Sequence, residues 1–149
     1  MGTFSLNRDE SKYKLSPEAA TAQVRQLIEH YQIDIDAQPD RKAKAAIEGV
    51  CERLVRFYRM GFLENVRDGN RLTVRQHLAN PPGETKDLDW AQMGAKAKLA
   101  TDGFDQDDRY ARAYALIAHL TGLPPQAVHE LRGVDLNAAE DLGLLFLLG

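Results

Sequence analysis

The apolar residues of this chain change their spacing twice along its length, and this change restricts the fold more than any other feature. They recur at helical spacing up to about Tyr58, alternate with polar residues around Asp68-Gly69, and return to helical spacing from Ala91. Helical spacing gathers apolar side chains on one face of a helix, whereas alternation gathers them on one face of a strand. The sequence therefore predicts a predominantly helical α+β fold, with an N-terminal antiparallel helix pair, a small antiparallel β-sheet and a C-terminal helical cluster.

Two amphipathic helices are expected in the N-terminal part. The first begins at Ser16-Pro17, because a serine hydroxyl can accept a hydrogen bond from an early amide and proline is favoured at the first helical position. Its apolar stripe extends to Ile35, and we expect it to end before Pro39, since proline disfavours helical geometry in the preceding residue. The second helix is expected from about Asp40 to Tyr58.

A β-hairpin is predicted around Asp68-Gly69, a favoured hairpin turn in which both central residues adopt positive φ. After the turn, Leu72, Val74 and Gln76 alternate with polar residues, as in a half-buried strand. The segment "NPPGE" predicts a rigid turn, and "TKDLDW" after it is compatible with a third short strand.

Helical signals return at Ala91 and predict a cluster of helices. The first of these helices is expected to end at Gly103, and the second to be capped by Asp105 and to end at Gly122. A short third helix is expected to begin at Pro124 or Pro125, reach Arg132 and end at Gly133. Asp135 is the expected cap of the last helix. The last helix ends in the run "GLLFLL", which must be buried in the core or by a partner. We expect most of it to complete the core, and Leu145, Phe146 and Leu148 are candidates for a partner-binding surface.

Size and composition agree with one globular domain spanning residues 1–149. The 149 residues include 44% hydrophobic and 28% charged ones, as in ordinary soluble proteins. A formal net charge of −3 gives no electrostatic reason to expect nucleic acid or an anionic membrane as the main partner. The first residues lack the apolar segment of a signal peptide and Cys51 is the one cysteine, so a cytoplasmic location is expected.

The sequence contains no pattern typical of catalysis or of metal or cofactor binding. Its four histidines lack the spacing of a zinc site, and "DGFDQDD" lacks the ligand positions and the glycine of a calcium loop. A glycine-rich phosphate loop and a nucleophile-elbow serine are also missing. Cys51 borders an apolar helix face, where an inert thiol is expected. We therefore expect a protein that is not an enzyme and needs no cofactor or metal.

Three arginines lie at three-residue intervals on the second expected helix. Arg53, Arg56 and Arg59 are candidates for a basic ridge that binds an acidic partner or RNA. The alternative is a solvated helix face whose charges form local ion pairs, and this is the interpretation that we prefer.

The segment "LIAHLTGLPPQAVHELRG" is similar to the DNA-reading half of a helix-turn-helix. Its second helix would present Gln126, His129 and Arg132 to the DNA. The residues from Asp105 to Gly149, however, include seven acidic and three basic side chains, so this part of the chain would carry a net negative charge toward a polyanion. A small helix-turn-helix DNA-binding regulator is therefore the alternative function, and we do not favour nucleic acid as the partner.

The segment "KAKLATDGFDQDDRYARAYALIAHLTGLPPQAVHELRGVDLNAAEDLGLLFLL" resembles the C-terminal half of tail assembly chaperones of long-tailed bacteriophages. With the preceding "VRQHLANPPGE", the resemblance extends from about Leu72 to the end of the chain. It implies a non-enzymatic phage or prophage protein that acts in the host cytoplasm and is absent from the mature virion. The implied partners are the tape-measure protein and, as a further candidate, the tail-tube protein. Homo-oligomerisation is left open, as is the binding face.

Overall fold

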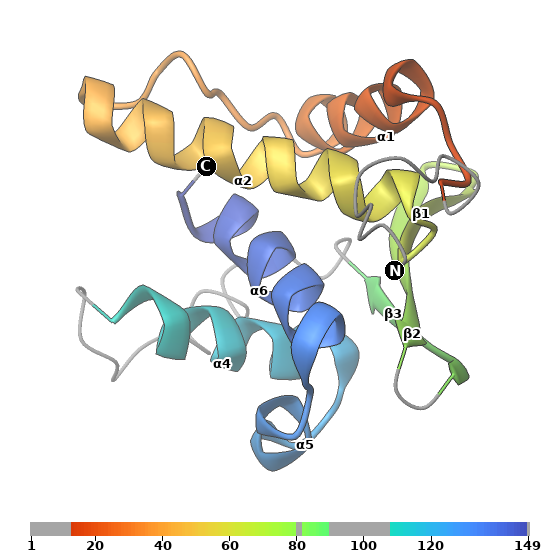
Figure 1. Ribbon diagram of the computed structural model, residues 1–149. Helices are drawn as coiled ribbons and strands as arrows, with labels where there is room; N and C mark the ends of the chain where they lie inside the picture. Colours follow the sequence, from red (N-terminus) through yellow and green to blue (C-terminus); the bar gives the residue numbers. More distant parts are fainter. Residues whose placement is uncertain (1–12, 80–81, 90–107, 149) are drawn as a thin grey trace, which may run out of the picture.

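The computed structural model describes residues 13–79, 82–89 and 108–148 (Figure 1). Its elements, in chain order, are α1 (Pro17–His30), α2 (Arg41–Arg59), β1 (Leu63–Asp68), β2 (Arg71–Ala79), β3 (Pro82–Asp89), α4 (Arg109–Thr121), α5 (Pro125–His129) and α6 (Gly133–Leu148). This is a predominantly helical α+β fold with a small antiparallel sheet, which confirms the predicted fold class.

The helices α1 and α2 lie side by side and run in opposite directions, as the sequence predicts (Figure 1). The hydroxyl of Ser16 accepts a hydrogen bond from the amide of Ala19, which caps the start of α1. In the same way, the carboxylate of Asp40 accepts one from the amide of Ala43 at the start of α2. Both helix starts therefore depend on side chains that can be recognised locally in the sequence.

The prediction that the first helix extends toward Pro39 is wrong, because α1 ends at His30. Gln32 adopts a φ of 54°, which is incompatible with continuing the helix. The Tyr31 hydroxyl donates a hydrogen bond of 2.7 Å to the carbonyl of Leu72 in β2. Ile33 and Ile35 then pack on the core from the irregular link of turns and bends between α1 and α2. Tertiary contacts thus decide the end of α1.

The three strands are arranged in the order β1-β2-β3, with both pairs antiparallel. Asp68 pairs with Arg71, so the two-residue turn of the first hairpin consists of Gly69 and Asn70. Only Gly69 of this pair has a positive φ, at 61°, and the predicted central pair Asp68-Gly69 is therefore wrong by one residue. Glycine at the first central position is the requirement of a type II′ turn.

The predicted alternation in β2 is confirmed. Leu72, Val74 and Gln76 are buried, and so is Leu78. The third strand that the sequence left open is present as β3, which begins at Pro82 within the segment expected to be a turn.

Several predicted boundaries in the C-terminal cluster differ from the structure. The cap of α4 is Asp108, whose carboxylate accepts a hydrogen bond of 3.1 Å from the amide of Ala111. The expected helix at 91–103 and the expected cap Asp105 lie outside the described residues. Gly122 ends α4 with a φ of 74°, as predicted, whereas α5 ends at His129 and does not reach Arg132.

Asp135 and Gly133 have roles that the sequence did not predict. Gly133 is the first residue of α6, so it begins that helix and does not end the preceding one. Asp135 lies within the first turn and is buried, and its carboxylate accepts a hydrogen bond of 2.7 Å from the amide of Ala79. Its backbone carbonyl also accepts a hydrogen bond of 2.8 Å from the side-chain amide of Gln76. A residue expected to cap a helix therefore joins α6 to β2.

Helix α6 lies in the middle of the molecule, between α2 on one side and α4 on the other (Figure 1). Leu142 and Leu145 are fully buried, and they belong to the core that also contains residues of α1, α2 and the sheet. At Gly143, an added Cβ would lie 3.2 Å from the Cβ of Ala113, so the glycine permits close packing of α6 on α4. None of the described helices combines the length and apolar character needed to cross a membrane.

Candidate functional site

An open groove of about 580 Å³ lies where α2, α4 and α6 meet, and we call it the α2–α6 groove. The spacing of its residues places them on one face of each helix, since Arg53, Phe57 and Met60 are four and three residues apart. Asn137, Asp141 and Leu144 repeat the same spacing on α6. The complete lining is Arg53, Arg56, Phe57, Met60, Tyr110, Asn137, Glu140, Asp141 and Leu144.

An ion pair between Arg53 and Asp141 joins α2 to α6 within the groove. The Arg53 Nε donates to both carboxylate oxygens of Asp141 at 3.1 Å, and Nη2 lies 3.1 Å from Oδ1. The Asp141 side chain is 6% exposed, whereas that of Arg53 is 52% exposed. The pair therefore has one side chain in the core and one at the surface.

Burial and pairing act in opposite directions on Asp141. Desolvation raises the pKa of its carboxyl above the usual value, and the hydrogen bond and charge of Arg53 lower it, with a net rise. The hydrogen bond to Asp141 is also the main reason why the pKa of Arg53 is raised. A carboxylate in this position depends on its arginine to remain charged.

The second carboxylate of the groove is also engaged by a side chain of the protein. The Tyr114 hydroxyl, from α4, donates a hydrogen bond to Oε1 of Glu140. Burial and the bond to Glu140 raise the pKa of Tyr114 to about 12. Tyr114 therefore remains a neutral donor at physiological pH, and Glu140 is held toward α4.

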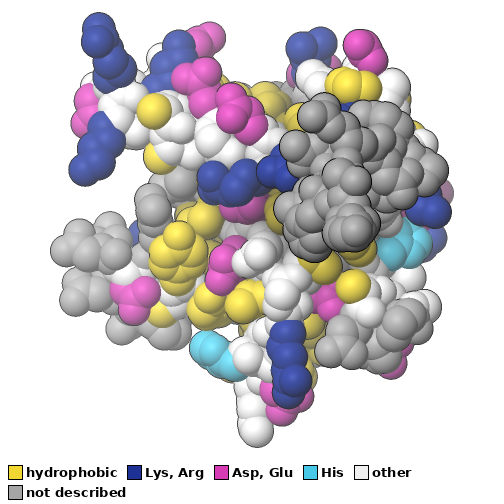
Figure 2. All heavy atoms as spheres, in the orientation of Figure 1, with side chains coloured by type: hydrophobic (Ala, Val, Ile, Leu, Met, Phe, Trp, Pro, Cys, Tyr) yellow, Lys and Arg dark blue, Asp and Glu magenta, His cyan; other side chains and the backbone are white. Residues whose placement is uncertain are grey.

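Arg56 differs from these residues because it is exposed and its side chain has no ion pair or hydrogen bond with any residue that the structure describes. Around it, Phe57 and Met60 supply partly exposed apolar surface, Leu144 is 3% exposed, and Tyr110 is 45% exposed. Figure 2 shows Lys and Arg side chains along α2 above a mixed apolar and acidic area over α4 and α6. The groove can therefore bind an apolar side chain and an anion together.

The predicted basic ridge is divided in the structure. Arg53 and Arg56 line the α2–α6 groove, but Arg59 is directed toward the N-terminal segment. Its Nε donates to the carbonyl of Leu15 at 3.3 Å, and its guanidinium lies 4.0 Å from the centre of the Tyr13 ring. Arg53 is therefore engaged by a distant residue of α6 and Arg59 by the N-terminal segment, which differs from the local ion pairs that we preferred, and the side chain of Arg56 has no such partner among the described residues.

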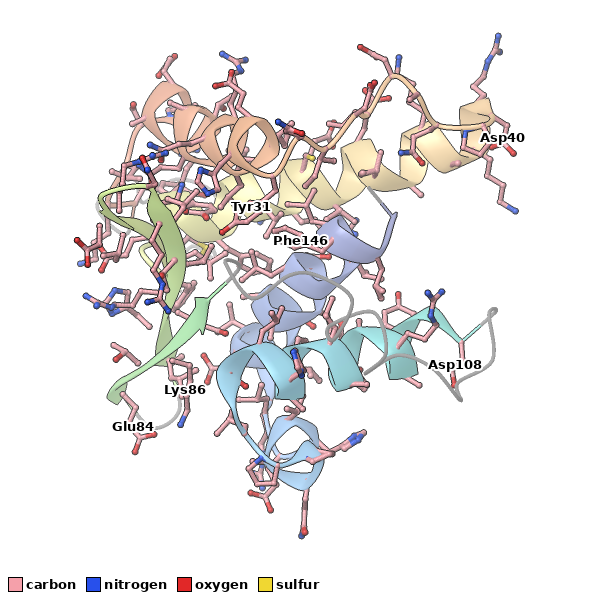
Figure 3. All side chains as sticks on the ribbon, turned by 180° about the vertical axis from the view of Figure 1, so that it is seen from behind. Tyr31, Asp40, Glu84, Lys86, Asp108 and Phe146 are labelled. Atoms are coloured by element: carbon pink, nitrogen blue, oxygen red, sulfur yellow. The ribbon has the colours of Figure 1, made fainter. Side chains whose placement is uncertain are left out.

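The three apolar candidates at the end of the chain do not form one surface. Leu145 is fully buried in the core and offers no accessible area to a partner. Phe146 is half-buried, and its ring meets that of Tyr31 edge to face with centroids 5.2 Å apart (Figure 3). The side chain of Leu148 lies outside the described part of the structure. The expectation that most of the apolar run completes the core is confirmed, since Leu142, Leu144 and Leu145 are buried.

Arg53 and Arg56 are the groove residues that the sequence offered as candidates, and the other seven were missed, namely Phe57, Met60, Tyr110, Asn137, Glu140, Asp141 and Leu144. One signal was available for Asp141, because a carboxylate inside the apolar run "AAEDLGLLFLL" needs a partner if the helix is buried. The sequence does not indicate that Arg53 is this partner, because the two residues are 88 positions apart in the chain.

A second hollow of about 580 Å³ lies between α1 and α2. Val24, Ile28 and Val55 contribute to it, and an ion pair of 3.0 Å between Lys44 and Asp36 lies at its edge. Cys51 also lines this hollow, and burial raises the pKa of its thiol, which is the environment of an unreactive cysteine. The α2–α6 groove is the stronger candidate, because polar groups from three helices converge there around a buried ion pair.

Among the described residues, no three His, Cys, Asp or Glu side chains are grouped so that they could hold a metal ion. His77 lies 3.0 Å from the carboxylate of Glu64, and His129 stacks edge to face on Tyr114. Helix α5, the proposed DNA-reading element, has only five residues, and Arg132 lies beyond its end.

Comparisons of the chain with protein-family models, with curated protein sequences and with solved structures find no match. The α2–α6 groove is therefore the feature from which a function is inferred.

Proposed function

We propose that this chain is a non-enzymatic phage or prophage tail assembly chaperone that binds the tape-measure protein during tail morphogenesis. The observation that supports it is the α2–α6 groove, which is open to solvent and lined by both apolar and charged side chains. Its volume of about 580 Å³ is sufficient for a few side chains of one helix face. The resemblance of the residues after Leu72 to such chaperones supplies the identity of the partner.

A helical client is the partner that suits this groove. Amphipathic helices dock by inserting apolar side chains, spaced three or four residues apart, into a groove between helices. Phe57 and Met60 would contact such side chains, while Tyr110 would cover them from α4. A chaperone that covers apolar stripes of a long helical client would prevent its aggregation until the tail tube forms around it.

The rest of the proposal follows from the resemblance. The protein would act in the cytoplasm of the infected bacterium, and it would leave the assembly before the virion matures. The tail-tube protein is a second partner to test, since it must replace the chaperone on the tape-measure protein.

The experiment is co-expression with a tape-measure protein encoded beside the gene of this chain. We expect the client to aggregate alone and to remain soluble and co-purify with the wild-type chain. Replacing Tyr110 with Ser removes exposed apolar area from the groove and should reduce the amount of client recovered. A client that aggregates equally with and without the wild-type chain would refute the proposal.

The matched control is the double substitution Gln126→Ala and Arg132→Ala, at exposed positions away from the groove. It should leave client binding unchanged. The same variant also tests the alternative function, because a helix-turn-helix regulator would lose a salt-sensitive affinity for DNA when these donors are removed.

A further inference from the structure

We propose that the α2–α6 groove selects an acidic amphipathic helix, and that Arg56 pairs with a carboxylate of that helix. The inference rests on the proposed function, since it specifies the chemistry of the client segment that the groove would bind. It concerns the charge of the partner, which the proposed function leaves open.

The charges of the groove are not equally available to a partner. Asp141 is covered and neutralised by Arg53, which approaches it with two nitrogens. Glu140 accepts the hydroxyl of Tyr114 and is half-buried. Arg56 is exposed, and its guanidinium has no hydrogen bond or ion pair with any residue that the structure describes. The charge that remains open to a partner is therefore positive.

Arg56 lies next to the apolar part of the groove, and this determines where the partner helix must carry its apolar and acidic residues relative to each other. Arg56 adjoins Phe57 in the chain and lies one helical turn before Met60, the C-cap of α2. A partner helix that places an apolar side chain against Met60 and Tyr110 would present a neighbouring residue to Arg56. A glutamate there gains a charge-assisted hydrogen bond, whereas a lysine meets both Arg56 and the half-exposed Arg53.

Two synthetic peptides test the inference without knowledge of the natural segment. Each has about 16 residues, with leucines at helical spacing on one face. One carries glutamates beside the leucine stripe and the other carries lysines at the same positions. Fluorescence anisotropy measures their binding to the wild-type chain, to Arg56→Glu and to the control Arg41→Glu, an exposed arginine at the other end of α2.

We expect the acidic peptide to bind the wild-type chain and Arg41→Glu equally, and Arg56→Glu on the order of tenfold more weakly. The lysine peptide should show the opposite preference and bind Arg56→Glu better than the wild type. Added salt should weaken binding of the acidic peptide to the wild type. Thermal unfolding of Arg56→Glu should show a cooperative transition only slightly below that of the wild type, since the substitution opposes the dipole of α2 but breaks no side-chain hydrogen bond or ion pair among the described residues.

The inference is overturned if both peptides bind equally, if neither binds the wild-type chain, or if the two arginine variants behave alike. These outcomes are separate from failure of the proposed function. A client kept soluble by both the wild type and Arg56→Glu would remove the role of Arg56 and leave the chaperone role. A client that the wild type fails to keep soluble would remove the chaperone role, whereas the peptide result decides the charge preference by itself.

Discussion

Replacing Arg53 with Met should destabilise the protein by about 2 kcal/mol near neutral pH. Methionine keeps most of the aliphatic volume of the side chain, so the loss reports mainly on charge and hydrogen bonding. Asp141, with 6% of its side chain exposed, would then be a buried carboxylate without its cation. The cost is placed below that of a fully buried pair, because the Arg53 side chain is 52% exposed and water reaches one side of the site.

The penalty should depend on pH in a defined direction. Since the folded-state pKa of Asp141 is raised, its contribution to stability is present below the unfolded pKa of about 3.9 and is lost as pH rises through the folded value. Removing Arg53 removes the interactions that lower this pKa, so the folded value rises further. The difference in stability between wild type and variant should therefore be largest near pH 7 and shrink toward about pH 4.

Urea denaturation at several pH values measures both effects, and a double-mutant cycle with Asp141→Asn isolates the pair. Asp141→Asn should cost less than Arg53→Met, because it leaves a half-exposed arginine in water and no buried charge. The double variant should be more stable than the sum of the two single losses implies. Additive losses within about 0.5 kcal/mol, or a penalty for Arg53→Met that is the same at both pH extremes, would refute this reasoning.

Three further substitutions test other parts of the fold. Tyr31→Phe removes the hydrogen bond to the Leu72 carbonyl and should cost about 1 kcal/mol of stability, measured by urea denaturation. Burial raises the pKa of Tyr31 to about 12, so the variant should also lose the absorbance change of this tyrosine in an alkaline titration. Asp40→Ala removes the cap of α2 and should also cost about 1 kcal/mol, measured by thermal unfolding (Figure 3). Gln23→Ala removes the side-chain oxygen that accepts a hydrogen bond from the backbone N–H of Asn65 on the edge strand β1. An unpaired N–H on an edge strand can pair with another chain, so self-association, measured by light scattering, should increase.

Each of these expectations has a contrary result. An unchanged stability of Tyr31→Phe or Asp40→Ala would mean that the hydrogen bond in the folded protein is no stronger than the bonds that the same groups make with water in the unfolded chain. A Gln23→Ala variant that remains as dispersed as the wild type would show that α1 protects the edge of β1 by its bulk, without that hydrogen bond.

Local signals account for the parts of the fold that the sequence predicted well. Ser16 and Asp40 cap helices by bonds to residues three positions away, and the alternation of Leu72 and Val74 follows from the geometry of a single strand. None of these features needs knowledge of a distant segment. The sequence around each of them is therefore sufficient to predict them.

The errors and omissions involve long-range contacts. The end of α1 depends on a bond between Tyr31 and Leu72, which are 41 residues apart, and the groove depends on Arg53 meeting Asp141 across 88 residues. Asp135 was predicted as a cap from its local context, yet the amide of Ala79 is its partner. For the candidate site, the sequence indicated Arg53 and Arg56 but could not separate them from Arg59, because equal spacing on a helix does not specify the neighbours.

The position of α6 also sets the order in which this chain can fold during synthesis. A ribosome makes α1, α2, the sheet and α4 before it makes the helix that packs between them. The apolar faces of α2 and α4 that Leu142 and Leu145 later cover must therefore remain exposed until that point. Nascent chains in this state are prone to aggregation. Emergence of α6 from the ribosome is thus the step that converts a set of helices with open apolar faces into a closed core.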